Sequence, residues 1–467
     1  MKRMALVVLA SCAPALPNVH VAKVQLPSSF EGGASGKGIA TIDWASFFAD
    51  DRLNALIADA LHGNFDLQLA VQRIEVARAA IAQVSGERLP QLALTADAGA
   101  RKYPRYTVDG AGNVGTDIAP GRPTPTIVPD FYVGVQASWE PDLWGRLGRA
   151  EGAARLRYLA SVEAHRLVTT SLIANVATAY FTLAAHDETA RVLDQTIARQ
   201  TQALEMMQIE KQAGRTNELA VSQFEAELAT TRALAIHVQA ETRELELQLA
   251  YLLGHAPAPI ARSPDALSRP LPSLAAGVPS DLLRARPDIR EAELEVQAAQ
   301  LDVAAARGAF YPHLRIAADL GYEAFDPRFL FRTPASLAYS LVGGLVAPLI
   351  NRRGIEAAFR TATAAQVSAM VTYQSTVLRS FIDAASALST LQHAAQIVTR
   401  QEEKQSALAD SVEAANLLFR AGKATYLEVL LAQQQTLQAE LELITARRDQ
   451  QIAKVRLYRA LGGGWTK

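Results

Sequence analysis

Cysteine is almost absent from this chain of 467 residues: Cys12 is the only one. A single thiol excludes an intramolecular disulfide and a metal site built from several cysteines. Long apolar runs are also missing, since no stretch approaches the roughly 18 consecutive apolar residues of an ordinary transmembrane helix. The net charge is −1, so the chain has no basic field that would attract nucleic acid.

Recognisable catalytic groupings are missing as well. The eight histidines are scattered along the chain, and no nucleophile stands in a pattern with a base. We therefore predict that the protein is not an enzyme, with no catalytic residue, no metal site and no cofactor apart from a covalent lipid. With 49% hydrophobic residues, the chain can nevertheless bury a large core.

The lipid is predicted from the first residues. A basic start, Met1–Met4, precedes an apolar segment, Ala5–Ala10, and then Ser11 and Cys12. This order resembles a bacterial lipoprotein signal, in which residues 1–11 are removed and Cys12 becomes an acylated N-terminus. The alternative is a chance cysteine in a cytosolic leader. The apolar segment is short for a signal peptide, which leaves the position of the start codon open.

Proline is missing from two long runs of helix formers, residues 355–421 and 425–461. Gly422 lies between them and accepts a positive φ without strain, so it is predicted to cap one helix and turn the chain into the next. Gly214 occupies a similar segment between helices predicted at about 147–213 and 217–253. The two glycines are 422 − 214 = 208 residues apart, which indicates an internal duplication.

Four segments change from a helical period to a period of two. Apolar and polar residues alternate over 91–100, 131–140, 313–322 and 337–342, which predicts β-strands with one apolar face. Their length and pattern fit tilted membrane-spanning strands, while a soluble hairpin with one wet face is the alternative. The loop between the first two strands, 101–130, is predicted to be irregular, and its role as a receptor or a lid stays open.

The predicted organisation is one repeat unit occurring twice. Each unit contains a helix, a β-hairpin and a long helical hairpin, and the first helix is predicted as one segment over about 43–86, its partner over 280–309. The predicted segments are the signal 1–11, an acylated extended arm 12–42, the first repeat 43–255 with its hairpin at 91–140, a proline-rich connector 256–279, the second repeat 280–462 with its hairpin at 313–347, and a tail 463–467.

Four strands cannot close a barrel, and lipid does not tolerate an open sheet edge. The chain must therefore associate with other copies. Three copies would supply twelve strands, an even number within the range of known barrels, and twelve long helices that could enclose a tunnel. Two or four copies would also give even numbers.

Several segments resemble signatures of a known family: Trp44–Leu53, Asn64–Leu67, Trp139–Arg146 and Val278–Arg290. They are similar to the TolC-like outer-membrane factors of tripartite efflux systems, in particular the lipoprotein branch that serves resistance-nodulation-division (RND) pumps. The resemblance covers nearly the whole chain. It implies a homotrimeric, α+β membrane protein in the outer membrane, with a twelve-stranded barrel continued by a periplasmic helical barrel. Ala13, directly after Cys12, favours the outer membrane by the same resemblance.

The implied function is passive export. The resemblance implies an exit duct that conducts drugs or other small toxic compounds from an inner-membrane RND pump and a periplasmic adaptor to the outside. The exported substrate and the identity of the pump and adaptor are left open. The alternatives are a type I protein secretion channel, which shares the fold, and a periplasmic coiled-coil scaffold, which would leave the four strands unexplained.

The resemblance also implies roles for the hairpin tips. Gly214, Arg215, Gly422 and Lys423 are expected to contact the adaptor. The periplasmic aperture is expected at Leu427, Glu428 and Leu431, with Phe419 at the position of an aromatic residue that braces the closed state. Relatives often have aspartate where this chain has Leu431, so the acidic ring does not transfer. Whether Glu428 replaces it stays open.

Overall fold

A computed structural model describes residues 13–17, 24–27, 29, 42–269, 285–348 and 352–465. The predicted signal peptide and Cys12 lie outside these ranges. The chain forms two compact units, and each draws on separated stretches of sequence. One unit contains 1–21, 76–158 and 294–370, and the other contains 22–75, 159–293 and 371–467. These units cut across the predicted repeats, so the predicted segment boundaries stay a prediction.

The elements follow the same order twice along the chain. The first series consists of α2 (Trp44–Phe48), α3 (Asp51–Gly63), α4 (Phe65–Gly86), β1 (Gln91–Lys102), β4 (Ile127–Trp139), α6 (Arg146–Gln212) and α7 (Glu218–Leu253). The second consists of α9 (Pro287–Gly308), β5 (His313–Ala324), β6 (Leu337–Val346), α10 (Arg353–Arg420) and α11 (Tyr426–Ala460). The predicted long helices and the four strands are therefore present.

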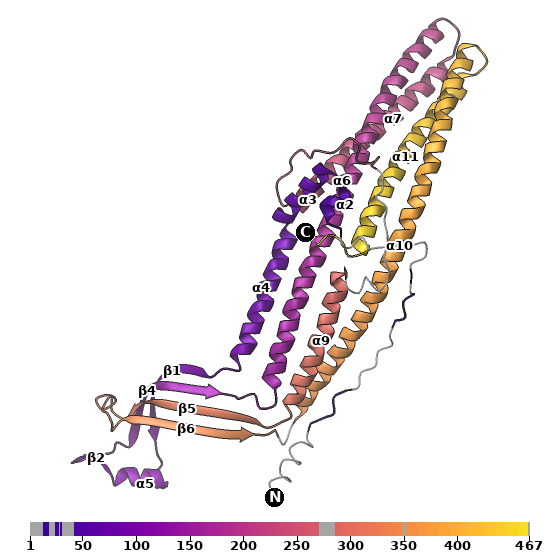
Figure 1. Cartoon of the computed structure of the whole chain (residues 1–467). Helices are drawn as coiled ribbons and strands as arrows, with labels where there is room; N and C mark the ends of the chain where they lie inside the picture. The colour runs from indigo at the N-terminus through magenta and orange to yellow at the C-terminus, as the bar shows by residue number, and fades with distance from the viewer. Residues whose placement is uncertain are drawn as a thin grey trace. The chain divides into compact units, whose positions relative to one another are not determined.

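The first unit contains a four-stranded antiparallel sheet in the order β1-β4-β5-β6 (Figure 1). Residues that pair across neighbouring strands place their side chains on the same face. The register pairs Leu94 with Val135, Val135 with Leu320 and Leu320 with Tyr339. The predicted apolar sides of all four strands thus combine into one continuous apolar face. Within the described chain, β1 and β6 each pair on one side only.

A tyrosine crosses the seam between β4 and β5. Gly134 and Gly321 are paired there, and a Cβ added to Gly321 would lie 2.6 Å from the Cα of Gly134. The side chain of Tyr132 lies over both glycines, since its ring would come within 3 Å of a Cβ added to either one. Only glycine permits this close approach of ring and backbone.

The loop between β1 and β4 is more ordered than predicted. It contains a helix, α5 (Val108–Val114), and a short hairpin of β2 (Asp117–Ala119) and β3 (Arg122–Pro123). Thr107 begins the helix, because its hydroxyl accepts a hydrogen bond from the backbone N–H of Gly110 at 3.1 Å. The prediction of an irregular loop was wrong, since it missed this N-cap.

The second unit contains most of the helical core. Figure 1 shows α6 with α7 and α10 with α11 as two antiparallel pairs whose turns lie at the same end. The core is centred on α6, whose Tyr180 and Leu183 are fully buried and cluster with Leu53 of α3 and Leu457 of α11. One apolar window of α6 is hydrophobic enough to cross a membrane, but 61% of it is buried inside the chain. That burial is typical of a core helix.

The predicted continuous helix over 43–86 is broken twice. Asp50 caps α3 through hydrogen bonds from the N–H groups of Arg52 (3.0 Å) and Leu53 (3.2 Å), after Ala49 takes a positive φ of 50°. Asn64 accepts a hydrogen bond from the N–H of Leu67 at 3.1 Å and donates to the carbonyl of Leu252 at 2.9 Å. Apolar periodicity persists across both breaks, so the pattern did not reveal them.

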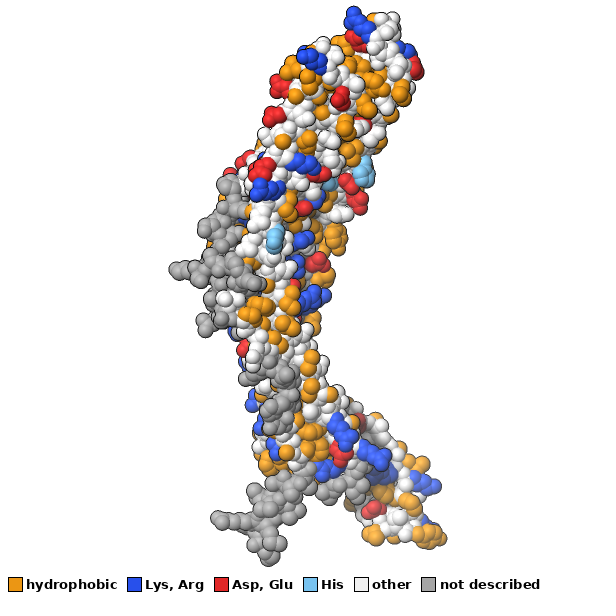
Figure 2. Space-filling model, turned by 90° about the vertical axis from the view of Figure 1, so that its right-hand side faces the viewer, with side chains coloured by type: hydrophobic (Ala, Val, Ile, Leu, Met, Phe, Trp, Pro, Cys, Tyr) orange, Lys and Arg blue, Asp and Glu red, His pale blue; other side chains and the backbone are white. Residues whose placement is uncertain are grey.

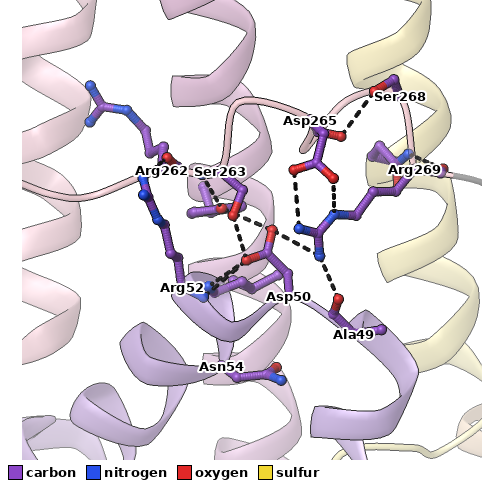
Figure 3. A network of polar contacts seen from close by, with 12 residues as sticks. Ala49, Asp50, Arg52, Asn54, Arg262, Ser263, Asp265, Ser268 and Arg269 are labelled. Carbon is purple, nitrogen blue, oxygen red and sulfur yellow. Dashed lines mark hydrogen bonds and ion pairs between the residues drawn. The ribbon is translucent and has the colours of Figure 1, made fainter.

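The connector after α7 is held by a polar network around Asp50 (Figure 3). The buried carboxylate accepts hydrogen bonds from the hydroxyls of Tyr180 and Ser263, both at 2.9 Å. Arg269 lies 3.5 Å from Asp50 and pairs with Asp265 at 3.1 Å, and it also donates to the carbonyl of Ala49. These contacts fix 263–269 to α3 and α6, and residues 270–279 of the predicted connector lie outside the described residues.

Candidate functional site

The first hairpin tip ends α6 with a glycine in the left-handed conformation. Gly214 has a φ of 70°; its N–H donates to the carbonyl of Lys211, and that of Arg215 donates to the carbonyl of Glu210, both at 2.9 Å. This pair of bonds defines a Schellman cap. Asn217 then begins α7 by accepting a hydrogen bond from the N–H of Ala220 at 3.0 Å.

The second tip has the same backbone geometry. Gly422 has a φ of 68°, with hydrogen bonds from its N–H to the carbonyl of Phe419 at 3.0 Å and from Lys423 to Leu418 at 2.8 Å. The predicted cap and turn are therefore confirmed at both glycines. A Cβ at Gly214 or Gly422 would meet no heavy atom within 4 Å, so the backbone angle, not space, requires glycine there.

Glu428 has a structural partner at the start of α11. Its carboxylate accepts hydrogen bonds from the backbone N–H of Thr425 at 2.6 Å and from the Thr425 hydroxyl at 2.9 Å. The N–H of Glu428 in turn contacts that hydroxyl, which completes a capping box. These bonds lower the pKa of Glu428, because they stabilise its charged form. A fixed, ionised carboxylate therefore lies at the tip.

The two leucines expected at the aperture are exposed. Leu427 is 54% exposed and Leu431 is 51% exposed, so the chain leaves about half of each side chain uncovered. Leu431 also lines a groove of about 770 Å³ between α7, α10 and α11, together with Leu408 and Leu437. The structure thus brings Leu427 and Glu428 to the tip of α11, with Leu431 one turn farther along.

Phe419 has a different environment from these residues. It is half-buried and packs, with Tyr426, against a small cluster of Met207, Phe224 and Leu430. This cluster joins the α6–α7 hairpin to the α10–α11 hairpin close to both tips. Sequence reasoning missed its members other than Phe419, although apolar residues within ten positions of Gly214 and Gly422 offered a signal.

The remaining predicted site residues are Arg215, Lys423 and Cys12. Within the described ranges, no group of three histidine, cysteine, aspartate or glutamate side chains is arranged to hold a metal ion. Arg215 forms an ion pair with Glu210 at 3.5 Å, while Lys423 is exposed at the second tip. Cys12 lies outside the described residues. The tips therefore offer shape, charge and exposed leucines rather than reactive chemistry.

A family model described as "Outer membrane efflux protein" matches residues 56–255 and 278–463. The chain belongs to the outer membrane efflux protein family. Its relatives include the cation efflux system protein CusC of Escherichia coli O6:H1, which is 28% identical over 90% of this chain and 88% of its own length. The pyoverdine export outer membrane protein OpmQ of Pseudomonas putida is 30% identical over 99% of this chain and 96% of its own length.

A solved structure supports the same family. The open state of the Neisseria gonorrhoeae MtrE outer membrane channel superposes with a TM-score of 0.84 at 25% identity, and it covers 97% of this chain and 99% of that one. This outer membrane efflux protein therefore lies in the outer membrane and serves as an exit duct for efflux. The predicted family, location and function are confirmed.

Proposed function

We propose that three copies of this outer membrane efflux protein form one channel without catalytic activity. The four-stranded sheet supports this proposal most directly. Its apolar face extends across all four strands, and the large side chains on it are exposed, including Leu92, Leu94, Tyr339 and Leu341. Lipid can cover that face, but the backbone groups at the edges of β1 and β6 need partners. In a twelve-stranded barrel, β1 of one copy pairs with β6 of the next.

The helices support association as well. Figure 2 shows hydrophobic side chains in patches between charged groups over the helical surface. On α10, Val371, Leu378 and Ile382 are exposed and follow each other at intervals of seven and four residues. This spacing is that of a coiled-coil seam. In the proposed trimer, the seam packs against a helix of a neighbouring copy.

The proposed trimeric channel is tested by measuring the mass of the assembly and its conductance in the same preparation. Native mass spectrometry of the full-length protein, released from detergent, is expected to show a species with the mass of three chains. Single-channel recording in a planar bilayer is then expected to show stable openings from the same preparation. A monomer without conductance would favour the periplasmic scaffold and contradict the proposal.

The two series of elements are proposed to descend from a duplication. Asn64 donates to the carbonyl of Leu252 at 2.9 Å, and Arg286 donates to the carbonyl of Ala460, also at 2.9 Å. The acceptors are 460 − 252 = 208 residues apart, the same separation as the tip glycines. Each side chain thus satisfies a terminal carbonyl of the second hairpin helix in its own half, which supports an equivalent origin.

The proposed route of transport runs from an inner-membrane RND pump and a periplasmic adaptor through this duct. The adaptor contacts the tips at Gly214, Arg215, Gly422 and Lys423, and the aperture is formed by Leu427, Glu428 and Leu431. The names of the relatives cover cations, pyoverdine and toluene. Such different cargoes support a duct that does not choose its substrate, so we assign it drugs and other small toxic compounds selected by the pump.

Cys12 is proposed to carry the lipid that anchors the N-terminus. A relative from Salmonella typhimurium is named a probable outer membrane lipoprotein, SilC, and it is 26% identical over 98% of this chain. Intact-mass measurement of the mature protein would test acylation, with Cys12→Ala as the unmodified control. An identical mass shift in both proteins would exclude lipid on Cys12.

A further inference from the structure

The turn that leads from β4 into α6 carries two indoles in fixed positions. The Trp139 N–H donates to the carbonyl of Arg88 at 2.9 Å, and the Trp144 N–H donates to the carbonyl of Pro312 at 2.6 Å. Trp144 also stacks on Tyr311, with ring centroids 5.1 Å apart. Both indoles therefore use their donors inside the protein and offer the surroundings only apolar ring surface.

These rings remain accessible and continue the apolar face of the sheet. Trp139 is 38% exposed and Trp144 is 42% exposed, and the nearby Leu89 and Leu143 are exposed as well. Trp139 lies on the apolar side of β4, where it pairs with Ile316. Indoles at the end of a membrane strand lie at the level of the lipid headgroups. This location places neighbouring polar groups within reach of the headgroups.

Among the arginines near these two indoles, Arg149 is the one that forms no ion pair within the described residues. Arg88 pairs with Glu151 at 2.5 Å, and Arg146 pairs with Glu140 at 2.7 Å. The exposed Arg149 instead donates one N–H to the carbonyl of Trp144 at 2.9 Å, and it forms no ion pair with any carboxylate in the described part of the chain. Its guanidinium is thus held at the backbone carbonyl of Trp144, and its further N–H groups have no acceptor among the described residues.

The backbone of the turn cannot take the place of Arg149. The N–H groups of Leu147 and Gly148, in the first turn of α6, already donate to the carboxylate of Asp142 at 3.2 and 2.7 Å. An anion approaching this helix end would meet a carboxylate instead of free amides. A positive charge that no carboxylate of the described residues pairs with is supplied here by the Arg149 side chain.

We propose that Arg149 binds the phosphate of an anionic phospholipid in the periplasmic leaflet, with Trp139 and Trp144 packing against its acyl chains. The guanidinium offers several donors in a planar fork that matches phosphate oxygens. The site is at the strand end that continues into α6, opposite the loop of α5, which places it on the periplasmic side. This inference rests on the proposed membrane position of the sheet.

Native mass spectrometry with added phosphatidylglycerol tests the site on the full-length protein. Arg149→Gln is expected to weaken phosphatidylglycerol binding by about tenfold, the effect of losing a charge-assisted hydrogen bond. Arg155→Gln is the matched control, because Arg155 is exposed nearby but pairs with Glu151 at 2.6 Å. Unchanged binding by Arg149→Gln, or an equal loss in both variants, would overturn the proposal.

The same spectra separate this inference from the proposed function. A trimer with unaltered lipid binding in Arg149→Gln leaves the channel proposal standing and rejects the lipid site. A second measurement uses vesicles of phosphatidylcholine brominated on its acyl chains, which quench nearby indoles. Quenching is expected to fall by more than half in the Trp139→Phe, Trp144→Phe double variant, which keeps Trp44 and Trp465. Equal fractional quenching of that variant would place these indoles outside the lipid and overturn the inference.

Discussion

Lys454 is a buried cation without a carboxylate partner in the described residues. It lies on α11 with 3% of its surface exposed, and its ammonium is 5.4 Å from the ring centroid of Phe47. Burial first, and the positive charge of Arg269 second, lower its pKa from 10.5 to about 8. A buried ammonium is disfavoured relative to its neutral form because it loses hydration.

This environment predicts a specific pH dependence. Below pH 8 the ammonium is charged in both the folded and unfolded states, so its burial lowers the free energy of unfolding by the full amount. This destabilisation disappears as the pH rises from about 8 to about 10.5. Lys454→Met is therefore expected to raise the melting temperature at pH 7 and to lack the increase in stability between pH 8 and 10. Thermal unfolding of both proteins across this range measures the difference, and parallel profiles would contradict the pKa assignment.

At the residue scale, Glu428 combines a helix cap with a charge at the tip. Its capping box means that Glu428→Ala removes both properties together. Glu428→Gln keeps a side chain that can accept the bond from Thr425, and it removes only the charge. We expect both variants to change leak conductance in a planar bilayer, since a ring of carboxylates attracts cations. Conductance that changes in Glu428→Ala but not in Glu428→Gln would assign the residue to the cap alone.

At the element scale, substitutions of the two tip glycines can distinguish the effect of backbone strain from the effect of surface shape on adaptor binding. Gly214 and Gly422 have positive φ angles and open space around them, so alanine costs about 1–2 kcal/mol at each through the backbone. Replacing both by tryptophan adds bulk to the surface that the adaptor is proposed to contact. The double tryptophan variant is expected to lose drug resistance while still forming trimers, and the double alanine variant is expected to keep most of it. Normal resistance with both tryptophans would exclude docking at the tips.

The seam between β4 and β5 makes a second prediction at this scale. A valine at Gly321 would bring its Cβ within 2.6 Å of the Gly134 Cα and the Val133 carbonyl, and both are backbone atoms that cannot turn aside. Gly321→Val is therefore expected to destabilise the sheet by about 1–3 kcal/mol and to reduce the folded protein recovered in the outer membrane. Gly344→Val is the control, because Gly344 faces the same side of the sheet with nothing within 4 Å. Equal recovery of the two variants would contradict the role of the seam.

At the scale of the whole molecule, assembly depends on surfaces that one chain leaves uncovered. Leu378 and Ile382 on α10 are exposed, and burying each against another copy would contribute about 1.5–3 kcal/mol. Leu378→Glu with Ile382→Glu is therefore expected to shift the protein from trimer towards monomer without loss of helical content. Light scattering in detergent measures the mass, with Arg379→Glu as a control on the same helix. A stable trimer in the double variant would exclude Leu378 and Ile382 from the interface between copies.

Sequence alone determined the elements whose signals are local. Proline-free runs around Gly214 and Gly422 predicted the long helices, because a positive φ at a helix end requires glycine. Strict alternation predicted the four strands and their apolar faces, since successive side chains of a strand point to opposite sides.

Tertiary structure decided what depends on distant partners. Asp50 and Asn64 break a continuous helical pattern with local caps, and both side chains also bond to residues over a hundred positions away. The capping box of Glu428 is local, since threonine and glutamate three residues apart mark it in the sequence. The inter-hairpin packing of Phe419 became visible only when the helices were placed side by side, because periodicity marks an apolar face but not the face it meets.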